Sequence, residues 1–455
     1  MRTAALLPLD SDEARAAAGS ALELPGAAGV EVLISGSSTG LTRYARSQII
    51  QNTIRSELHA HVRVALEDRF GSAGTTRLDP ESIRAAAERA LRAAKAAPPD
   101  EDFPGLPEVS EVGRSEPVLR WDDDTATLPA QRRADAVGEI LDATASDNAA
   151  GIFSTSGHCY AVFSSTGVDC FDAFTRCVTT CLVDTGDSTG WGEASSFAAD
   201  LVDVGASGKR AAQKALASKD AIDADPGIYE VILEPSATAT LLDFLAYTGL
   251  GAKQMIDGES FLSERIGQKV ASDSVTVADD VRNELSVGTA FDFEGVPKKR
   301  VEVIVGGVAT GPVTDLRTSR KLDVANTGHA SGSNEFGPYA ANIVLEPGDL
   351  TYEELIAGVD DGFLVTRFHY TNVLDRPSTL LTGMTRDGIF RISKGEVGQP
   401  VHNFRFAQSV LDALGAVTGI GRDQLAIAPD YGAYGSTVTP AVRISGFNFA
   451  SRTSH

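Results

Sequence analysis

The sequence predicts an α+β protein in which a mixed N-terminal domain precedes a large β-rich C-terminal domain. Three observations support this. Strand-like segments alternate with Gly and Ser turns near the N-terminus, two amphipathic helical patterns follow, and the second half is rich in strand-like runs and Gly-containing turns. A chain of 455 residues is too long for one hydrophobic core, so we expect two or three domains.

The predicted N-terminal domain, residues 1–150, combines strands with two helices. GSSTG (36–40) is the expected hairpin turn between the first two strands. A helix is predicted over 79–97, because Asp79 is a good N-cap and the apolar residues after it recur at helical spacing. A second helix is predicted over 129–146, beginning at a proline. The expected strands are 30–35, 41–50 and 57–67.

A connecting β segment, residues 151–225, comes next. It is strand-like over 151–182 and contains a short surface helix over 208–219. The tight C-x-x-C pairs typical of zinc sites are absent from it, so we expect buried, reduced thiols. The four cysteines are Cys159, Cys170, Cys177 and Cys181.

The predicted C-terminal β-rich domain covers residues 226–455. It opens with a strand over 228–234 that leads into a helix over 236–248. Ser236 is the expected N-cap of this helix, and Gly249 is expected to end it. Two short helices are expected to interrupt the later strands, near 351–358 and 407–416.

The composition argues against two classes of partner. Acidic residues outnumber basic ones by 62 to 40, a net charge of -22 that repels the phosphates of nucleic acids and anionic lipids. No run of about 18 apolar residues occurs, so no membrane span is expected. The apolar run at the N-terminus is too short for a signal peptide, and we therefore expect a cytoplasmic protein.

Three short motifs invite a catalytic interpretation, but a structural one is favoured for each. GSSTG matches the nucleophile elbow G-x-S-x-G, yet the residues after it alternate like a strand rather than a helix. DTG (184–186) is found in aspartic proteases, but no second such loop is present, so a polar turn is expected. His59 and His61 share one face of a strand, but no nearby ligand completes a metal site.

The second half of the chain resembles the TldD/PmbA family, in segments that keep the family's order and spacing. TRYARSQIIQN (42–52) and the 79–97 helix extend the resemblance over almost the whole chain. The segments are FLSERIGQKVASDSVTVADD (261–280), FDFEGVPKKRVEVIVGGVATG (291–311), NTGHASG (326–332), NIVLEPGDLTYEELIAG (342–358), GFLVTRFHYTNVLD (362–375), TGMTRDGIFRISKGEV (382–397) and NFRFAQSVLDAL (403–414).

The resemblance implies a metallopeptidase of two subunits, of which one, TldD, carries H-E-x-x-x-H on a helix. In that motif two imidazoles hold zinc and the glutamate is the base for the attacking water. The corresponding helix here places Asp243 at the first histidine, Phe244 at the glutamate and Thr248 at the second histidine. The chain therefore resembles the TldE (PmbA) subunit, which lacks the ligands.

Three functional hypotheses follow. The first is a metal-free subunit that carries no cofactor and forms a heterodimer with a zinc-bearing TldD-type partner around an unfolded or leader peptide. The second is a standalone homodimeric protein that binds peptides without hydrolysis. The third is an active metalloenzyme whose ligands are displaced, for example to His59, His61 or Asp243.

Four further residues are weak candidates for the wall of a peptide chamber. They are polar groups set between apolar strands or in a Gly-rich loop, and none is expected to be catalytic. A structural role is favoured for each of them: a turn histidine for the first, and buried hydrogen-bond partners that hold loops for the other three. They are His329, His369, Arg386 and Arg405.

Overall fold

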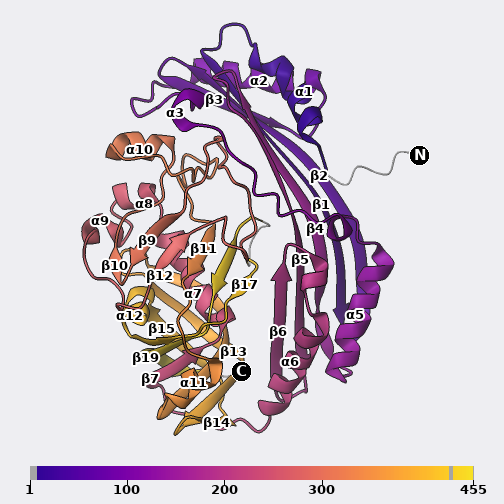
Figure 1. Ribbon diagram of the computed structural model, residues 1–455, viewed down its shortest axis with the longest axis vertical. Coiled ribbons are helices and arrows are strands. Elements are labelled where there is room, and N and C mark those ends of the chain that lie inside the picture. Colours follow the sequence, from indigo (N-terminus) through magenta and orange to yellow (C-terminus); the bar gives the residue numbers. More distant parts are fainter. Residues whose placement is uncertain (1–7, 430–433, 454–455) are drawn as a thin grey trace.

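The computed structural model describes residues 8–429 and 434–453, and its strands form three sheets (Figure 1). The first sheet is a long curved layer on one side of the molecule, and the other two lie opposite it. Helices and sheets of this kind are the α+β architecture that the sequence predicts. No helix in the described ranges is both long and apolar enough to cross a membrane.

The first sheet is antiparallel and has the strand order β3-β2-β1-β4-β5-β6. It joins the predicted segments 1–150 and 151–225 in one layer, because β4 crosses the boundary between them. All four cysteines are buried in β4 and β5 with free thiols, as predicted. The strands are β1 (Gly29–Ala45), β2 (Gln48–Leu66), β3 (Arg69–Thr75), β4 (Ala149–Ser164), β5 (Asp169–Asp184) and β6 (Thr189–Ser196).

The predicted hairpin turn at GSSTG (36–40) is wrong, because these residues lie inside β1. The turn is at Arg46 and Ser47, whose φ angles are 50° and 53°, so the predicted strand 41–50 spans it. The glycines serve close packing instead of chain reversal. A Cβ on Gly36 would lie 2.8 Å from Cys159 Sγ, and one on Gly40 would lie 2.6 Å from Arg133 Nη1.

Two helix pairs cover this sheet. At one end α1 (Ser11–Leu22) packs beside α2 (Pro80–Ala96), and at the other α5 (Ala130–Thr144) packs beside α6 (Val204–Ala217). The predicted 79–97 helix is confirmed, with the Asp79 carboxylate accepting from Ser82 N at 2.9 Å. The helix predicted at 208–219 begins earlier, because Asp203 caps it. The shorter helical turns here are α3 (Val109–Val112), α4 (Asp123–Ala126) and η1 (Ala199–Leu201).

The C-terminal part contains the other two sheets. In the seven-stranded sheet, β7-β19-β15-β13-β12 pair in a closed ring, since β12 also pairs with β7. Its strands are β7 (Gly227–Leu233), β12 (Asp361–Asp375), β13 (Leu380–Ser393), β14 (Glu396–Pro400), β15 (Phe404–Ser409), β16 (Val417–Ile420) and β19 (Val442–Arg452). The six-stranded sheet has β8 (Val277–Asp279), β9 (Val301–Val305), β10 (Val308–Ala309), β11 (Asn342–Leu345), β17 (Leu425–Ile427) and β18 (Ser436–Thr439).

Helix α7 (Pro235–Gly249) follows β7 and packs against both of these sheets. Its buried leucines join the largest hydrophobic core, and the helix ends at Gly249 as predicted. The predicted N-cap Ser236 is wrong: Pro235 already occupies the first turn, so Glu234 is the cap residue and Ser236 donates to Glu193. The remaining helices are α8 (Ala252–Ile256), α9 (Leu262–Arg265), α10 (Leu316–Leu322), α11 (Tyr352–Ala357) and α12 (Val410–Gly415).

Glu234 also ties the two halves of the molecule together. Its carboxylate is buried and accepts from Lys214 Nζ at 2.8 Å and Arg210 Nη2 at 3.0 Å, both on α6. The hydroxyl of Tyr352, on α11, donates to it at 2.6 Å. Burial alone would raise the pKa of Glu234, but the two cations outweigh burial and hold the pKa below its ordinary value.

Candidate functional site

Helix α7 presents three side chains at the positions that, according to the resemblance, hold the two zinc-binding histidines and the glutamate base in TldD-type subunits. Asp243 and Phe244 are half-buried, whereas Thr248 is fully buried. The Thr248 hydroxyl donates to the Phe244 carbonyl at 2.7 Å, one turn back along the same helix. The Thr437 hydroxyl, on β18, donates to Asp243 Oδ1. Both oxygen-bearing side chains are thus engaged within the protein.

Two adjoining cavities of about 340 Å³ and 400 Å³ open beside this helix. They share Tyr247, Tyr339 and Tyr434, so together they form one cleft, which we call the aromatic cleft. Rings from α7 and from distant loops line it, and Tyr247 stacks on Phe336 with 5.9 Å between ring centroids. A cleft with this lining suits apolar side chains of a ligand. Its aromatic residues are Phe244, Tyr247, Phe293, Phe336, Tyr339 and Tyr434.

His329 lies at the base of the aromatic cleft and is fully buried. Its Nε2 contacts Asp279 Oδ1 at 3.0 Å, and its Nδ1 contacts Thr327 Oγ1 at 2.9 Å. Burial favours a raised pKa for Asp279, but His329 and Lys298 outweigh it and the pKa is lowered. Both imidazole nitrogens are satisfied by the protein, so His329 holds the loop beneath the cleft.

The base of the cleft contains a cation that sequence reasoning did not single out. Lys298 is buried, lies 4.8 Å from the centre of the Tyr434 ring and contacts Asn342 Oδ1 at 3.4 Å. Asn342 donates its backbone N–H to Asp279 at 2.8 Å. Lys298, Asn342 and Asp279 lie in three separate segments of the family resemblance, and only the fold shows that they meet.

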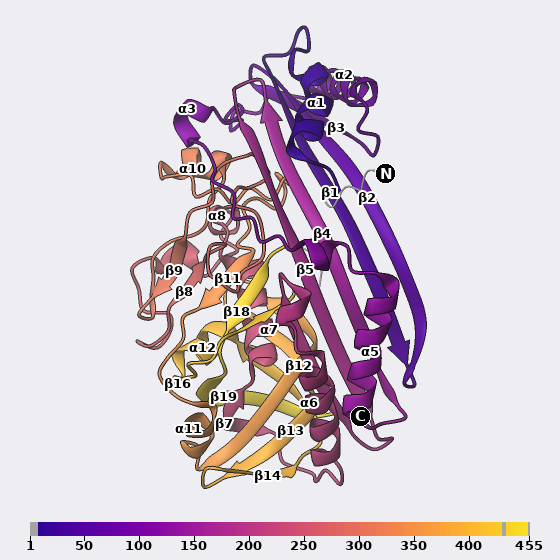
Figure 2. The same ribbon diagram turned by 45° about the vertical axis from the view of Figure 1, so that its right-hand side comes forward.

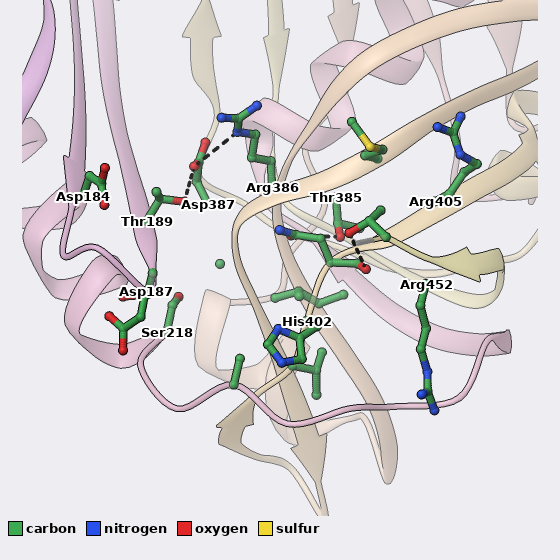
Figure 3. Close-up of a pocket in the computed structure, with 18 of the residues that line it drawn as sticks. Asp184, Asp187, Thr189, Ser218, Thr385, Arg386, Asp387, His402, Arg405 and Arg452 are labelled. Carbon is green, nitrogen blue, oxygen red and sulfur yellow. Dashed lines mark hydrogen bonds and ion pairs between the residues drawn. The ribbon is translucent and has the colours of Figure 1, made fainter. Parts of the chain in front are cut away.

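Arg386 and Arg405 line a different cavity of about 750 Å³, which we call the polar pocket (Figure 3). It lies between the β5–β6 turn and strands β13 and β15. Arg386 is half-buried and Arg405 is exposed, so the favoured role as buried hydrogen-bond partners is wrong for Arg405. An arginine on a strand between apolar residues can point to either face, and the sequence does not reveal which face a cavity occupies.

The remaining histidine candidates lie outside the aromatic cleft and the polar pocket. His369 is half-buried on β12, with its ring centroid 4.2 Å from that of Tyr370. His59 and His61 both lie on β2, as expected for histidines on one strand. The DTG segment is the polar turn that the sequence predicts, and Asp184 Oδ1 accepts from Gly186 N at 2.7 Å.

The side chains on α7 do not fit a zinc ion. Zinc in peptidases needs three protein ligands, and here Phe244 has no donor atom while the Thr248 hydroxyl is bonded to its own helix. In the described ranges, no group of three His, Cys, Asp or Glu side chains is arranged to hold a metal.

Comparison with known proteins places this architecture in a family. The family models "PmbA/TldA metallopeptidase C-terminal domain" and "PmbA/TldA metallopeptidase domain 1" match residues 226–451 and 30–94. A metalloprotease of Methanothermobacter thermautotrophicus is 27% identical over 223 residues, 49% of each chain. A TldD homologue of Buchnera aphidicola is 26% identical over 219 residues, 47% of this chain and 45% of the relative. The matched region thus spans about half the length of these relatives.

The solved structures show the same fold over nearly the entire chain. TldE from Thermococcus kodakarensis superposes with a TM-score of 0.83 at 21% identity, over 92% of this chain and 96% of that one. The two family models together cover the first sheet's opening strands and the whole C-terminal part. The chain therefore belongs to the PmbA/TldD metallopeptidase family.

Proposed function

We propose that this protein is the metal-free subunit of a cytoplasmic heterodimeric TldD/TldE-type metallopeptidase. In this proposal it binds a zinc-bearing TldD-type subunit and encloses an unfolded or leader peptide, which is cleaved at the partner's zinc. The chain itself supplies walls, orientation and exclusion of bulky folded substrates.

The observation that carries the proposal is the donor set on α7. Where the family's metal-bearing helix has two histidines and a glutamate, this helix has Asp243, Phe244 and Thr248. A phenyl ring cannot accept the proton of an attacking water, and Thr248 is fixed to the Phe244 carbonyl. The packing role of the helix is retained without the means to bind zinc.

An exposed strand edge supports assembly with a partner. β3 pairs with β2 only from Ala60 to Leu66, so the earlier part of β2 has an unpaired edge. Residues 48–57 of β2 are exposed on both faces, and they include Ile49, Ile50 and Ile54. Figure 2 shows β2 along the outer border of the layer. Open edges bearing apolar side chains are typical sites of association.

The aromatic cleft supports peptide binding. It combines apolar rings with a few polar groups, which is the composition of sites for extended chains and small ligands. Because one chain forms the cleft alone, a standalone homodimeric peptide-binding protein is the second candidate function.

Co-expression with a metal-bearing relative tests the proposal. Size-exclusion chromatography and cleavage of an unfolded peptide are measured for each chain alone and for the mixture. We expect a 1:1 complex, cleavage by the mixture, and none by this chain alone. Peptide binding by this chain with no change in elution when the relative is added would favour the homodimeric alternative.

A further inference from the structure

The polar pocket contains two arginines whose charge the protein leaves largely uncompensated. Arg405 forms no ion pair with any of the described residues. Arg386 Nε lies 3.7 Å from Asp387 Oδ1, but that carboxylate already accepts from Arg367 and from the Thr189 hydroxyl. Asp387 is therefore shared among several donors and neutralises Arg386 only in part.

The two arginines lie on the same side of neighbouring strands. Arg405 of β15 pairs with Met384 of β13, and Arg386 is two residues further along β13. Residues two apart on a strand face the same way, so Arg386 is a diagonal neighbour of Arg405. In Figure 3 both side chains extend in the same direction, whereas Arg452 extends in the opposite one. Arg452 is already engaged, since it pairs with Asp223 and Asp225.

Two like charges at diagonal positions on one sheet face repel each other, and an anion bound near them would relieve that repulsion. The two arginines keep most of their charge uncompensated although the whole chain has a net charge of -22 and contains many acidic residues that could pair with them. A carboxylate suits two guanidinium groups, which donate planar, charge-assisted hydrogen bonds. The opposite wall carries Asp184 and Asp187, which disfavour a dianion such as phosphate more than a monoanion.

We infer that the polar pocket binds the carboxylate of a peptide through Arg386 and Arg405. The volume of about 750 Å³ leaves room for several peptide atoms beyond the carboxylate. Asp184 and Asp187 line the same pocket from the end of β5 and the turn after it, and would accept N–H groups of the same peptide. The choice of a peptide as the bearer of the carboxylate rests on the proposed function, whereas the preference for a carboxylate rests on the charged residues of the pocket.

Fluorescence anisotropy with the isolated full chain tests this inference. The probes are a fluorescein-labelled pentaalanine with a free C-terminal carboxylate, the same peptide amidated, and an amidated peptide with one internal Glu. We expect the free carboxylate to bind at least tenfold more tightly than the amide. The Glu peptide distinguishes a side-chain carboxylate from a C-terminal one. Equal binding of all three peptides overturns the inference.

Variants locate the binding to the two arginines. Arg405→Gln and Arg386→Gln should each weaken binding of the free-carboxylate peptide about tenfold, and acetate should compete at least as well as inorganic phosphate. Arg422→Gln, an exposed arginine outside the pocket, should bind as the unaltered chain does. Unchanged binding by Arg405→Gln, or competition by phosphate alone, overturns the inference.

Assembly separates this inference from the proposed function. The double variant Arg386→Gln/Arg405→Gln should still elute with the metal-bearing relative. If the complex forms and cleaves peptide but the free carboxylate gives no advantage, the inference fails and the proposed function stands. If the isolated chain prefers the free carboxylate but never assembles, the reverse holds.

Discussion

Glu234 offers a sharp test of how the two halves of the molecule are held together, through the substitution Glu234→Gln. The side chain is only 3% exposed and accepts from Lys214, Arg210 and Tyr352. Removing one member of a buried ion pair typically costs about 3–5 kcal/mol, because the remaining charge stays buried. Arg210 is 40% exposed and can turn to water, so we discount its share and expect about 3 kcal/mol.

Urea unfolding at pH 7 measures this free energy. Glu230→Gln on β7, the strand that leads into Glu234, is the matched control. Glu230 lies 3.8 Å from Arg443 and is partly exposed, so its loss should cost about 1 kcal/mol or less. Lys214→Met combined with Glu234→Gln should be less destabilising than Glu234→Gln alone, because no buried ammonium is left unpaired. If the free energy of unfolding of Glu234→Gln lies within about 1 kcal/mol of that of the unaltered chain, the carboxylate does not hold the two halves together as the geometry indicates.

Three further outcomes follow from the structure. Because the pKa of Glu234 is lowered in the folded state, its contribution to the free energy of unfolding should be constant from pH 7 to 6 and be lost as the pH falls below about 4.5. Urea midpoints of the unaltered chain and of Glu234→Gln, measured across this pH range, test this. Gly190→Ala should destabilise by about 1–3 kcal/mol, since the new Cβ would lie 2.2 Å from Ala211 O, whereas Gly138→Ala, with nothing within 4 Å, should be neutral or stabilising in thermal melts. Ile54→Glu on the open edge of β2 should abolish co-elution with the metal-bearing relative. Ile228→Glu, a similarly exposed isoleucine on β7, should not. If the two variants behave alike, the edge of β2 is not the interface.

The sequence predicts correctly those elements that are determined by residues close together in the chain. The Asp79 cap and the apolar stripe of α2 are contiguous, so both appear in the structure where they were predicted. Helix α1 was missed although Asp10 and Glu13 form a capping box in its first turn, a signal that the sequence contains. The prediction for GSSTG is wrong because its two glycines are required by close packing against Cys159 and Arg133, which are over ninety residues away in the sequence.

The candidate site was only partly accessible from the sequence for the same reason. The family resemblance located Asp243, Phe244 and Thr248 on one helix, and the structure places that helix beside the aromatic cleft. The rings of Phe336 and Tyr434 reach the cleft from loops that no periodicity marks. Likewise, the exposure of Arg405 depends on which face of β15 is covered, which is decided by the packing of the whole domain.

The zinc content of the isolated protein tests the central proposal most directly. The full chain is purified without chelator, and bound metal is measured by elemental analysis alongside the metal-bearing relative. The account predicts far less than one zinc per chain here and about one in the relative. Stoichiometric zinc in this protein that is lost on Asp243→Ala would contradict it.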